Sequence, residues 1–290
     1  MAHLRFTFIT ACVTEGFFDP VKKGMRDAAA LMQADCTFIG TEDVDIPAQI
    51  QLVRDAINQK VDGIALNMIH ATAFNEVVSE ALDRGIPVVG FNVDAAPGSS
   101  RRLSAIRQDF YQAGVTLGSE AASSIPRGST VLATQHAAGV SALDDRLRGI
   151  QDALRSHDLA WRTVVTGNDP EPSAIVVTNE LETDPTVSAI LCTGQADTEG
   201  VVLALTRGFQ KADYYVAGFD LSPVILDALK TGLLKLTIDQ QPYAQGFYPV
   251  IQLALYCRYG IAPSDMDSGA SILTPDEVDR VFPLSRLQYR

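Results

Sequence analysis

The stretch Pro-Val-Val-Gly-Phe-Asn at residues 87–92 has the pattern of a buried β-strand that ends on an amide side chain. Residues 216–220 repeat this pattern as Val-Ala-Gly-Phe-Asp. Apolar runs of this kind are typical of parallel strands that helices cover on both faces. The residues that close them, Asn92 and Asp220, stand where an open parallel sheet faces its ligand. Capping of a strand end is the alternative for either residue alone, but the repetition predicts two similar lobes.

The sequence before this stretch alternates between strand-like and helix-like segments. A helix is predicted to end near residue 34, and Asp45-Ile46-Pro47 opens another, since proline fits a first helical turn. Apolar residues spaced along one helix face predict a third helix over residues 74–82. The strands predicted around these helices are residues 6–13, 37–40, 61–66 and 87–91. This order predicts a doubly wound parallel sheet.

The same alternation restarts in the second half of the chain. An apolar stripe over residues 143–154 marks one of its helices. The strands predicted here are residues 130–133, 163–165, 189–192, 215–218 and 235–238. With a short strand just before Asp109, the total of about ten strands is too many for one ordinary sheet. We therefore predict an α/β fold of two lobes, each with a parallel doubly wound sheet.

Composition and charge exclude some classes of partner. The chain has 290 residues, 47% of them apolar and 20% charged, which is typical of a globular protein. Its net charge is -12, from 23 Lys and Arg against 35 Asp and Glu. A non-specific nucleic-acid binder needs a basic face, and an anionic membrane surface also attracts basic segments. We therefore expect neither nucleic acid nor such a membrane as a direct partner.

The amino-terminal residues and the cysteines bear on the cellular compartment. Met-Ala-His-Leu-Arg-Phe leads directly into a predicted strand, so no signal peptide is visible, and no apolar run reaches a membrane span. The protein is then cytoplasmic, or its leader is absent from this sequence. The four cysteines are widely spaced and predict buried free thiols, with a bridge between Cys12 and Cys36 as the minor alternative.

Sequence motifs of catalysis and of cofactor binding are absent. The chain has no Gly-x-Ser-x-Gly, no Gly-x-Gly-x-x-Gly after its first strand and no Walker sequence. Its four histidines have no metal-ligand spacing, and Asp144-Asp145 fits the start of a helix. We therefore expect no cofactor and no metal, and a binding protein is simpler than an enzyme. An α/β enzyme that uses cleft carboxylates is a third alternative.

Aromatic and polar residues that follow predicted strands could form a sugar site. A sugar ring stacks on aromatic rings, and its hydroxyl groups need charged or planar partners. Inward packing of the two phenylalanines and solvent exposure of the arginine are the alternatives. The candidate residues are Phe17, Phe18, Asn92, Asp94, Asp109, Arg146, Gln195, Asp220 and Gln240.

Five motifs together carry a family resemblance. They are residues 16–24, 86–92, 146–149, 216–220 and 236–240, in this order along the chain. With them the chain resembles the type I periplasmic sugar-binding proteins, which feed ABC importers, over roughly residues 4 to 274. The resemblance implies two Rossmann-like lobes that three crossover segments join and that close on one sugar. It implies an amino-terminal lobe of residues 1–107 plus 240–267 and a second lobe of 108–239 plus 268–290.

The resemblance also implies roles for single residues. Phe17 and Phe18 match the pair that packs on the sugar ring, and Asn92 matches an Asp that accepts hydroxyl protons. Arg146 matches a bidentate Arg. Asp220 matches the Asp of the second lobe, and Gln240 matches a hinge Gln.

Three departures from the family pattern put ribose itself in doubt. Glu15 stands where Asn is usual, and Val93, with Asp94 beside it, stands where Arg is frequent. Residues 193–197 replace a loop that normally contains Asn and Asp. We therefore expect a site with fewer cations and one more acceptor, for another pentose, a hexose or a polyol.

The function predicted from these residues is capture without catalysis. The resemblance implies a periplasmic monomer that binds a monosaccharide or polyol and presents it to an ABC transporter permease. The alternative is the effector-binding core of a LacI-type transcription regulator, which shares the fold. An upstream helix-turn-helix in the full gene would favour that alternative, and a signal peptide would favour the periplasm.

Overall fold

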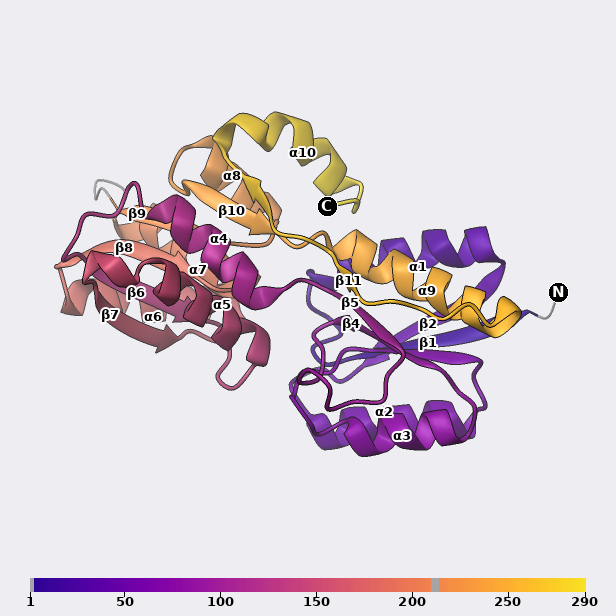
Figure 1. Cartoon of the computed structure of the whole chain (residues 1–290). Helices are drawn as coiled ribbons and strands as arrows, with labels where there is room; N and C mark the ends of the chain where they lie inside the picture. The colour runs from indigo at the N-terminus through magenta and orange to yellow at the C-terminus, as the bar shows by residue number, and fades with distance from the viewer. Residues whose placement is uncertain (1–2, 210–213) are drawn as a thin grey trace. The chain divides into compact units, whose positions relative to one another are not determined.

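Two six-stranded sheets organise the chain in the computed structural model, which describes residues 3–209 and 214–290 (Figure 1). The chain divides into two units. Unit 1 contains the residues up to Gln108, Gln241–Ser268 and Gln288–Arg290. Unit 2 contains Asp109–Gln240 and Gly269–Leu287.

Unit 1 combines the first five strands with a short late one and four helices. Its strands are β1 Leu4–Thr10, β2 Ala34–Gly40, β3 Gly63–Leu66, β4 Val88–Asn92, β5 Ser104–Arg107 and β11 Met266–Asp267. Its helices are α1 Phe18–Met32, α2 Ile46–Asn58, α3 Asn75–Asp83 and α9 Pro242–Tyr259. Helix α2 begins as predicted, because the Asp45 side chain accepts a hydrogen bond from the backbone N–H of Ala48 at 2.9 Å.

Unit 2, over its described residues 109–209, 214–240 and 269–287, repeats this construction with six strands and six α-helices. Its strands are β6 Thr130–Gln135, β7 Ala160–Val165, β8 Val187–Cys192, β9 Tyr215–Phe219, β10 Leu236–Asp239 and β12 Ser271–Leu273. Its α-helices are α4 Phe110–Ala121, α5 Ser141–Ala153, α6 Pro170–Thr183, α7 Gln195–Gly208, α8 Pro223–Lys230 and α10 Val278–Arg286. Two 3-10 turns, η1 Arg155–His157 and η2 Pro275–Glu277, complete the unit.

The strand orders of the two sheets correspond position by position. They are β11-β5-β4-β3-β1-β2 in unit 1 and β12-β10-β9-β8-β6-β7 in unit 2. All pairings are parallel except that of β12, which runs antiparallel to β10. The predicted α/β fold of two lobes with parallel sheets is therefore confirmed. Strand β4 corresponds to β9, so Asn92 and Asp220 end equivalent strands.

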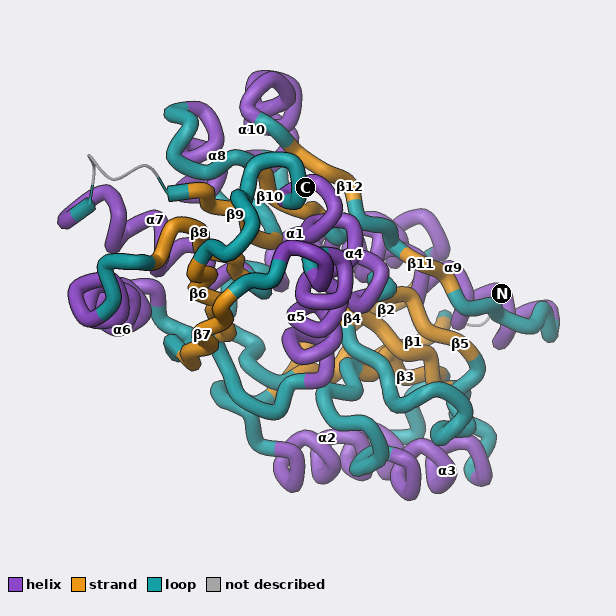
Figure 2. The backbone as a smooth tube through the Cα atoms, turned by 60° about the vertical axis from the view of Figure 1, so that its left-hand side comes forward, coloured by secondary structure: helices purple, strands orange, loops and turns teal. Residues whose placement is uncertain are grey.

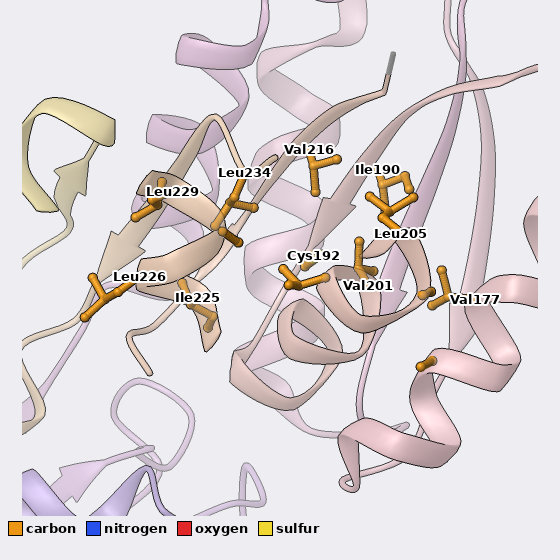
Figure 3. Packing of buried hydrophobic residues seen from close by; sticks show 14 of the residues in the cluster. Val177, Ile190, Cys192, Val201, Leu205, Val216, Ile225, Leu226, Leu229 and Leu234 are labelled. Atoms are coloured by element: carbon orange, nitrogen blue, oxygen red, sulfur yellow. The ribbon is translucent and has the colours of Figure 1, made fainter. Parts of the chain in front are cut away.

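Helices cover both faces of each sheet. In unit 1, α1 and α9 lie side by side on one face and bury Phe18, Val21 and Leu253 against the strands (Figure 1). Helices α2 and α3 cover the opposite face (Figure 2). In unit 2, α4 and α5 cover one face and α6, α7 and α8 the other. Figure 3 shows Ile190 of β8 beside Leu205 of α7 in this second core.

The carboxyl-terminal residues differ from the expected division of the chain. Residues 268–290 are all expected in the second lobe, but Ser268 and Gln288–Arg290 group with unit 1. Two boundary residues also differ from the expectation, since Gln108 groups with unit 1 and Gln240 with unit 2. The Tyr289 ring lies 5.2 Å from the ring of Tyr243 on α9, and the ammonium of Lys23 lies 4.7 Å from the Tyr289 ring centroid. One contact between aromatic rings and one between an ammonium group and a ring thus attach the end of the chain to unit 1.

All four cysteines are free, so the alternative bridge between Cys12 and Cys36 is not formed. Burial was predicted for all four, and the structure corrects this for two of them. Cys12 and Cys192 are buried, whereas Cys36 is half-buried on edge strand β2 and Cys257 is exposed at the end of α9. Within the described ranges, no helix has the length and apolarity needed to cross a membrane.

Candidate functional site

The guanidinium of Arg146 is the buried centre of a polar cluster in unit 2. This residue lies in the second turn of α5 and is only 2% exposed, so the solvent-exposed alternative is wrong. Its Nη1 donates a hydrogen bond to the carbonyl oxygen of Thr193 at 2.8 Å. The Arg146 Cζ atom lies 4.2 Å from the ring centroid of Phe219 and 5.2 Å from that of Phe110. These rings and the carbonyl fix the plane of the guanidinium.

Asp220 and Gln240 join Arg146 at the carboxyl edge of the sheet, the edge where its parallel strands end. The Asp220 carboxylate lies 3.8 Å from Arg146 Nη1. Its Oδ1 accepts a hydrogen bond of 2.6 Å from Gln240 Nε2. Because β9 and β10 are neighbours, their ends place these two side chains together. The structure thus brings together three of the residues predicted for the site.

Burial perturbs the ionisation of this pair. Burial raises the pKa of Asp220 above its ordinary value, and the charge of Arg146 and the Gln240 bond oppose that rise. Burial likewise lowers the pKa of Arg146, and the charges of Asp220 and Asp197 oppose that fall. Each charge is therefore maintained by its neighbours rather than by water. Such a dry, pre-oriented cluster suits the recognition of hydroxyl groups.

Close contact between α4 and α5 sets the position of Arg146. A Cβ atom at Gly114 of α4 would lie 2.1 Å from the backbone oxygen of Arg146. A Cβ atom at Gly149 of α5 would lie 2.2 Å from the oxygen of Tyr111. Only glycine fits at either place. The two helices therefore approach closely, and α5 carries the guanidinium to the carboxyl edge.

A second buried carboxylate lies behind this edge. Asp197 of α7 is fully buried and accepts hydrogen bonds of 2.8 Å from Thr134 Oγ1 and from the backbone N–H of Thr193. Its Oδ1 lies 3.2 Å from Nδ1 of His136, the residue that follows β6. Through Thr193, Asp197 positions the carbonyl group that binds Arg146.

The carboxyl edge of unit 1 is built around Asn92. Asn92 Nδ2 donates to Gln245 Oε1 of α9 at 3.1 Å, and Gln245 Nε2 donates to Ser268 Oγ at 2.9 Å. At the end of neighbouring β3, Asn67 Nδ2 donates to Thr10 Oγ1 at 2.9 Å. The Asn67 side chain also accepts from the backbone N–H of Val93 at 3.1 Å. Amide side chains from two strand ends and from α9 thus hold this edge in place.

Arginine side chains surround Asp94. Arg102 Nε donates to Asp94 Oδ1 at 2.6 Å, and Arg102 Nη2 binds the other carboxylate oxygen. Arg107 Nε lies 3.6 Å from Asp94 Oδ2. Arg107 is also the register partner of Asn92 across β4 and β5. Asp94 therefore binds arginines of its own unit, and Arg107 brings a cation to the edge.

The two adjacent phenylalanines have different surroundings. Phe18 is 3% exposed and packs in the core of unit 1, with its ring centroid 5.8 Å from that of Phe38. This contact fits the inward-packing alternative. Phe17 is half-buried, and its ring meets the Phe18 ring edge-on with 5.1 Å between the ring centroids. The buried Phe18 thus holds Phe17 in place. Burial raises the pKa of the Cys12 thiol to about 12, and the half-buried Glu15 in the same turn adds to that rise.

Two further predicted residues have local structural partners. Asp109 is exposed and caps α4, because its side chain accepts from the backbone N–H of Gln112 at 3.0 Å. Gln195 Nε2 donates to Glu199 Oε1 at 3.1 Å along the first turn of α7. A helix cap and a contact along the helix therefore hold these two side chains in place.

Sequence reasoning missed several polar residues of these edges. They are Asn67, Arg107, His136, Thr193, Asp197 and Gln245. A place directly after a predicted strand was the available signal for Asn67 and Thr193 alone. Across the described ranges, no group of three His, Cys, Asp or Glu side chains is arranged to hold a metal ion.

Comparison with known proteins assigns a family. A model of the periplasmic binding protein domain matches residues 6–260. Among curated proteins, the xylose/arabinose-binding protein XylF of Sulfolobus acidocaldarius is 27% identical over 299 residues, covering 98% of this chain and 74% of that protein.

Solved structures agree with that relationship. An ABC transporter solute-binding protein from Burkholderia graminis, in complex with D-arabinose, has a TM-score of 0.88 and 26% identity, with 94% and 96% of the two chains covered. A carbohydrate transporter from Acidothermus cellulolyticus, in complex with myo-inositol, also has a TM-score of 0.88 and 26% identity, with both chains fully covered, 100% each.

Proposed function

The chain belongs to the periplasmic binding protein domain family, and from that membership we propose that it captures one monosaccharide or polyol and delivers it to an ABC transporter permease. The observation that carries this proposal is the buried cluster of Arg146, Asp220 and Gln240. Two of these side chains present fixed donors and the third presents acceptors. Sugar hydroxyl groups both donate and accept, so this combination matches them.

Residues of both carboxyl edges are proposed to bind the ligand. In unit 2 we assign Arg146, Asp220 and Gln240 to its hydroxyl groups. In unit 1 we assign Asn92 to hydroxyl groups and the half-buried Phe17 to the apolar face of the ring. The remaining predicted residues are proposed to support the site: Glu15, Phe18, Asp94, Asp109 and Gln195.

The names of the relatives narrow the ligand class. One relative is named for xylose and arabinose, and the two solved structures are complexes with D-arabinose and myo-inositol; all of these are neutral polyhydroxylated compounds. We propose a ligand of this class and a monomeric protein that acts outside the cytoplasmic membrane. The relatives are sugar-binding and transport proteins, which favours capture over the effector core of a regulator and over catalysis.

Recovery of the bound compound tests capture against catalysis. The purified protein is incubated with D-arabinose, D-xylose and myo-inositol together, freed of excess by gel filtration and denatured, and the released compound is identified by mass spectrometry. We expect one compound in unchanged form and in about equal amount to the protein. Release of a chemically altered compound would contradict the proposal.

A further inference from the structure

Arg107 ends strand β5 at the carboxyl edge of unit 1. Its register partner across β4 and β5 is Asn92, which we propose to bind sugar hydroxyl groups, and its partner across β5 and β11 is Asp267. Neighbouring strands lie about 4.8 Å apart, so register partners are adjacent. The Arg107 side chain is half-buried, with 34% of it exposed. The strand pairing therefore places a long cation that solvent still reaches beside a residue of the proposed site.

Two contacts within unit 1 hold the Arg107 guanidinium. Its Nη1 donates a hydrogen bond to the backbone carbonyl oxygen of Gln108 at 2.9 Å. Its Nε lies 3.6 Å from Asp94 Oδ2, which is close enough for an ion pair but too long for a hydrogen bond. The side chain is thus partly fixed before any ligand arrives, so less conformational entropy is lost when it binds one.

Arg102 meets the hydrogen-bonding needs of the Asp94 carboxylate. Its Nε donates to Asp94 Oδ1 at 2.6 Å, and its Nη2 binds the other oxygen. The remaining nitrogen, Nη1, donates to Asp265 Oδ1 at 2.7 Å. Arg102 therefore uses all three nitrogens within unit 1. Arg107 differs, because its Nε and Nη2 donate no hydrogen bond to any residue in the ranges 3–209 and 214–290.

The unused nitrogens of Arg107 suit an acceptor that comes with the ligand. A guanidinium carries five N–H donors and no acceptor. Hydroxyl and ring oxygens of sugars and polyols accept hydrogen bonds, and a charged donor makes such bonds stronger. Asp94, already bound by Arg102, supplies the opposite charge nearby without occupying these donors. The fixed cation and its free N–H groups are thus available to an oxygen atom at the carboxyl edge of unit 1.

We infer that Arg107 is a specificity-determining residue that donates a hydrogen bond to one oxygen atom of the bound sugar or polyol. This inference rests on the proposed function. A ligand that lacks this oxygen would shield the half-buried guanidinium from water without giving it a partner, and an unpaired charged donor is costly. Arg107 therefore selects compounds that carry an oxygen atom at this position and rejects those that do not.

Matched arginine variants test this inference. Arg107→Met removes every donor and keeps a stem of similar length, and Arg107→Lys keeps the positive charge near Asp94 in case the methionine variant does not fold. Arg101→Met is the control, because Arg101 is exposed in the loop before β5 and pairs with Asp83 of α3 at 2.8 Å. Calorimetry gives the dissociation constants for D-arabinose, D-xylose and myo-inositol, and then for each monodeoxy analogue of the compound that the parent binds most tightly.

We expect Arg107→Met to bind that compound at least tenfold more weakly than the parent, Arg107→Lys to show a smaller loss, and Arg101→Met to keep the parental affinity. For one monodeoxy analogue, the parent and the Arg107 variants should bind within twofold of one another, because the oxygen atom that Arg107 contacts is missing. The other analogues should keep the full loss.

Two results overturn the inference alone: parental affinity in the Arg107 variants, or the same factor of loss for the sugar and for every analogue. The second result would show that Arg107 supports the fold of the edge without contacting the ligand. If the parent binds none of the three compounds, the proposed function and this inference fall together.

Discussion

Asn92 and Asp220 share a left-handed backbone conformation, with φ of 61° and 69°, at the ends of the equivalent strands β4 and β9. Each side chain is held by a glutamine: Asn92 by Gln245 and Asp220 by Gln240. Asn and Asp tolerate this conformation better than most residues. The repeated sequence motif therefore encodes a repeated turn that fixes one polar side chain at the carboxyl edge of each sheet.

Substitution of Asn92 separates the backbone requirement from the side-chain bond. Asn92→Ala and Asn92→Gly both lose the bond to Gln245. Only alanine is strained in the left-handed backbone conformation, which lowers the free energy of unfolding by about 1–2 kcal/mol. Glycine costs about 0.5–1 kcal/mol in chain entropy. We expect urea unfolding to show Asn92→Gly more stable than Asn92→Ala by about 0.5–1 kcal/mol. An alanine variant at least as stable as the glycine variant would show that the turn imposes no strain.

Removal of the Arg146 side chain is expected to weaken sugar binding by about 2–4 kcal/mol, because buried polar partners lose their donor. Arg146→Lys keeps the charge without the planar fork and should lose part of that energy while remaining folded. Arg148→Lys is the control, because Arg148 is exposed on the same helix and pairs with Asp145 at 2.9 Å. Calorimetry gives the three affinities. An Arg146→Ala protein that binds as tightly as the parent would refute the assignment.

A methyl group at Gly114 should disturb both stability and binding. Gly114→Ala places a Cβ atom 2.1 Å from the Arg146 oxygen, so α4 and α5 must separate. Overpacking of this kind costs about 1–3 kcal/mol of unfolding free energy. Because α5 carries Arg146, the sugar affinity should fall too. Gly208→Ala is the control, since a Cβ atom at Gly208 meets nothing within 4 Å. Equal melting temperatures for the two variants would disprove close packing.

Asp27 should make unit 1 sensitive to acid. Its carboxylate accepts hydrogen bonds from Lys23 Nζ at 2.6 Å and from the Tyr243 hydroxyl at 2.9 Å, and these contacts lower its pKa. A lowered pKa stabilises the fold above the ordinary value of about 3.9, and this contribution disappears as the pH falls through the lowered value. Between pH 5 and pH 2, chemical denaturation should therefore show a smaller loss of stability for Asp27→Asn than for the parent.

The fold could be predicted from the sequence because its signals are local. Apolar runs predicted ten of the described strands. The two strands that were not predicted are β11, with two residues, and β12, with three. Such short segments carry no periodicity. Residues 275–290 lie beyond the stretch that carries the family resemblance, yet they form η2 and α10 before the end of the chain returns to unit 1. That return depends on contacts of Tyr289, which no local pattern reveals.

Strand ends made part of the site predictable. Asp220 and Gln240 follow adjacent strands, so their proximity followed from the pattern. The pairing of Asp94 with Arg102 could not be predicted from the sequence pattern, because it depends on the path of the loop before β5. His136 and Asp197 were missed for the same reason: α7 brings its carboxylate to the end of β6, and strand order and helix rotation are tertiary properties.

Titration of the unmodified protein with D-arabinose, D-xylose and myo-inositol tests the central claim most directly. At a ligand concentration of about one hundred times the dissociation constant, binding stabilises the folded state by about 2.7 kcal/mol, which a melting curve resolves. We predict saturable binding of at least one of these compounds, with one ligand per chain by calorimetry. Absence of heat and of any melting-temperature shift with all three would contradict the account.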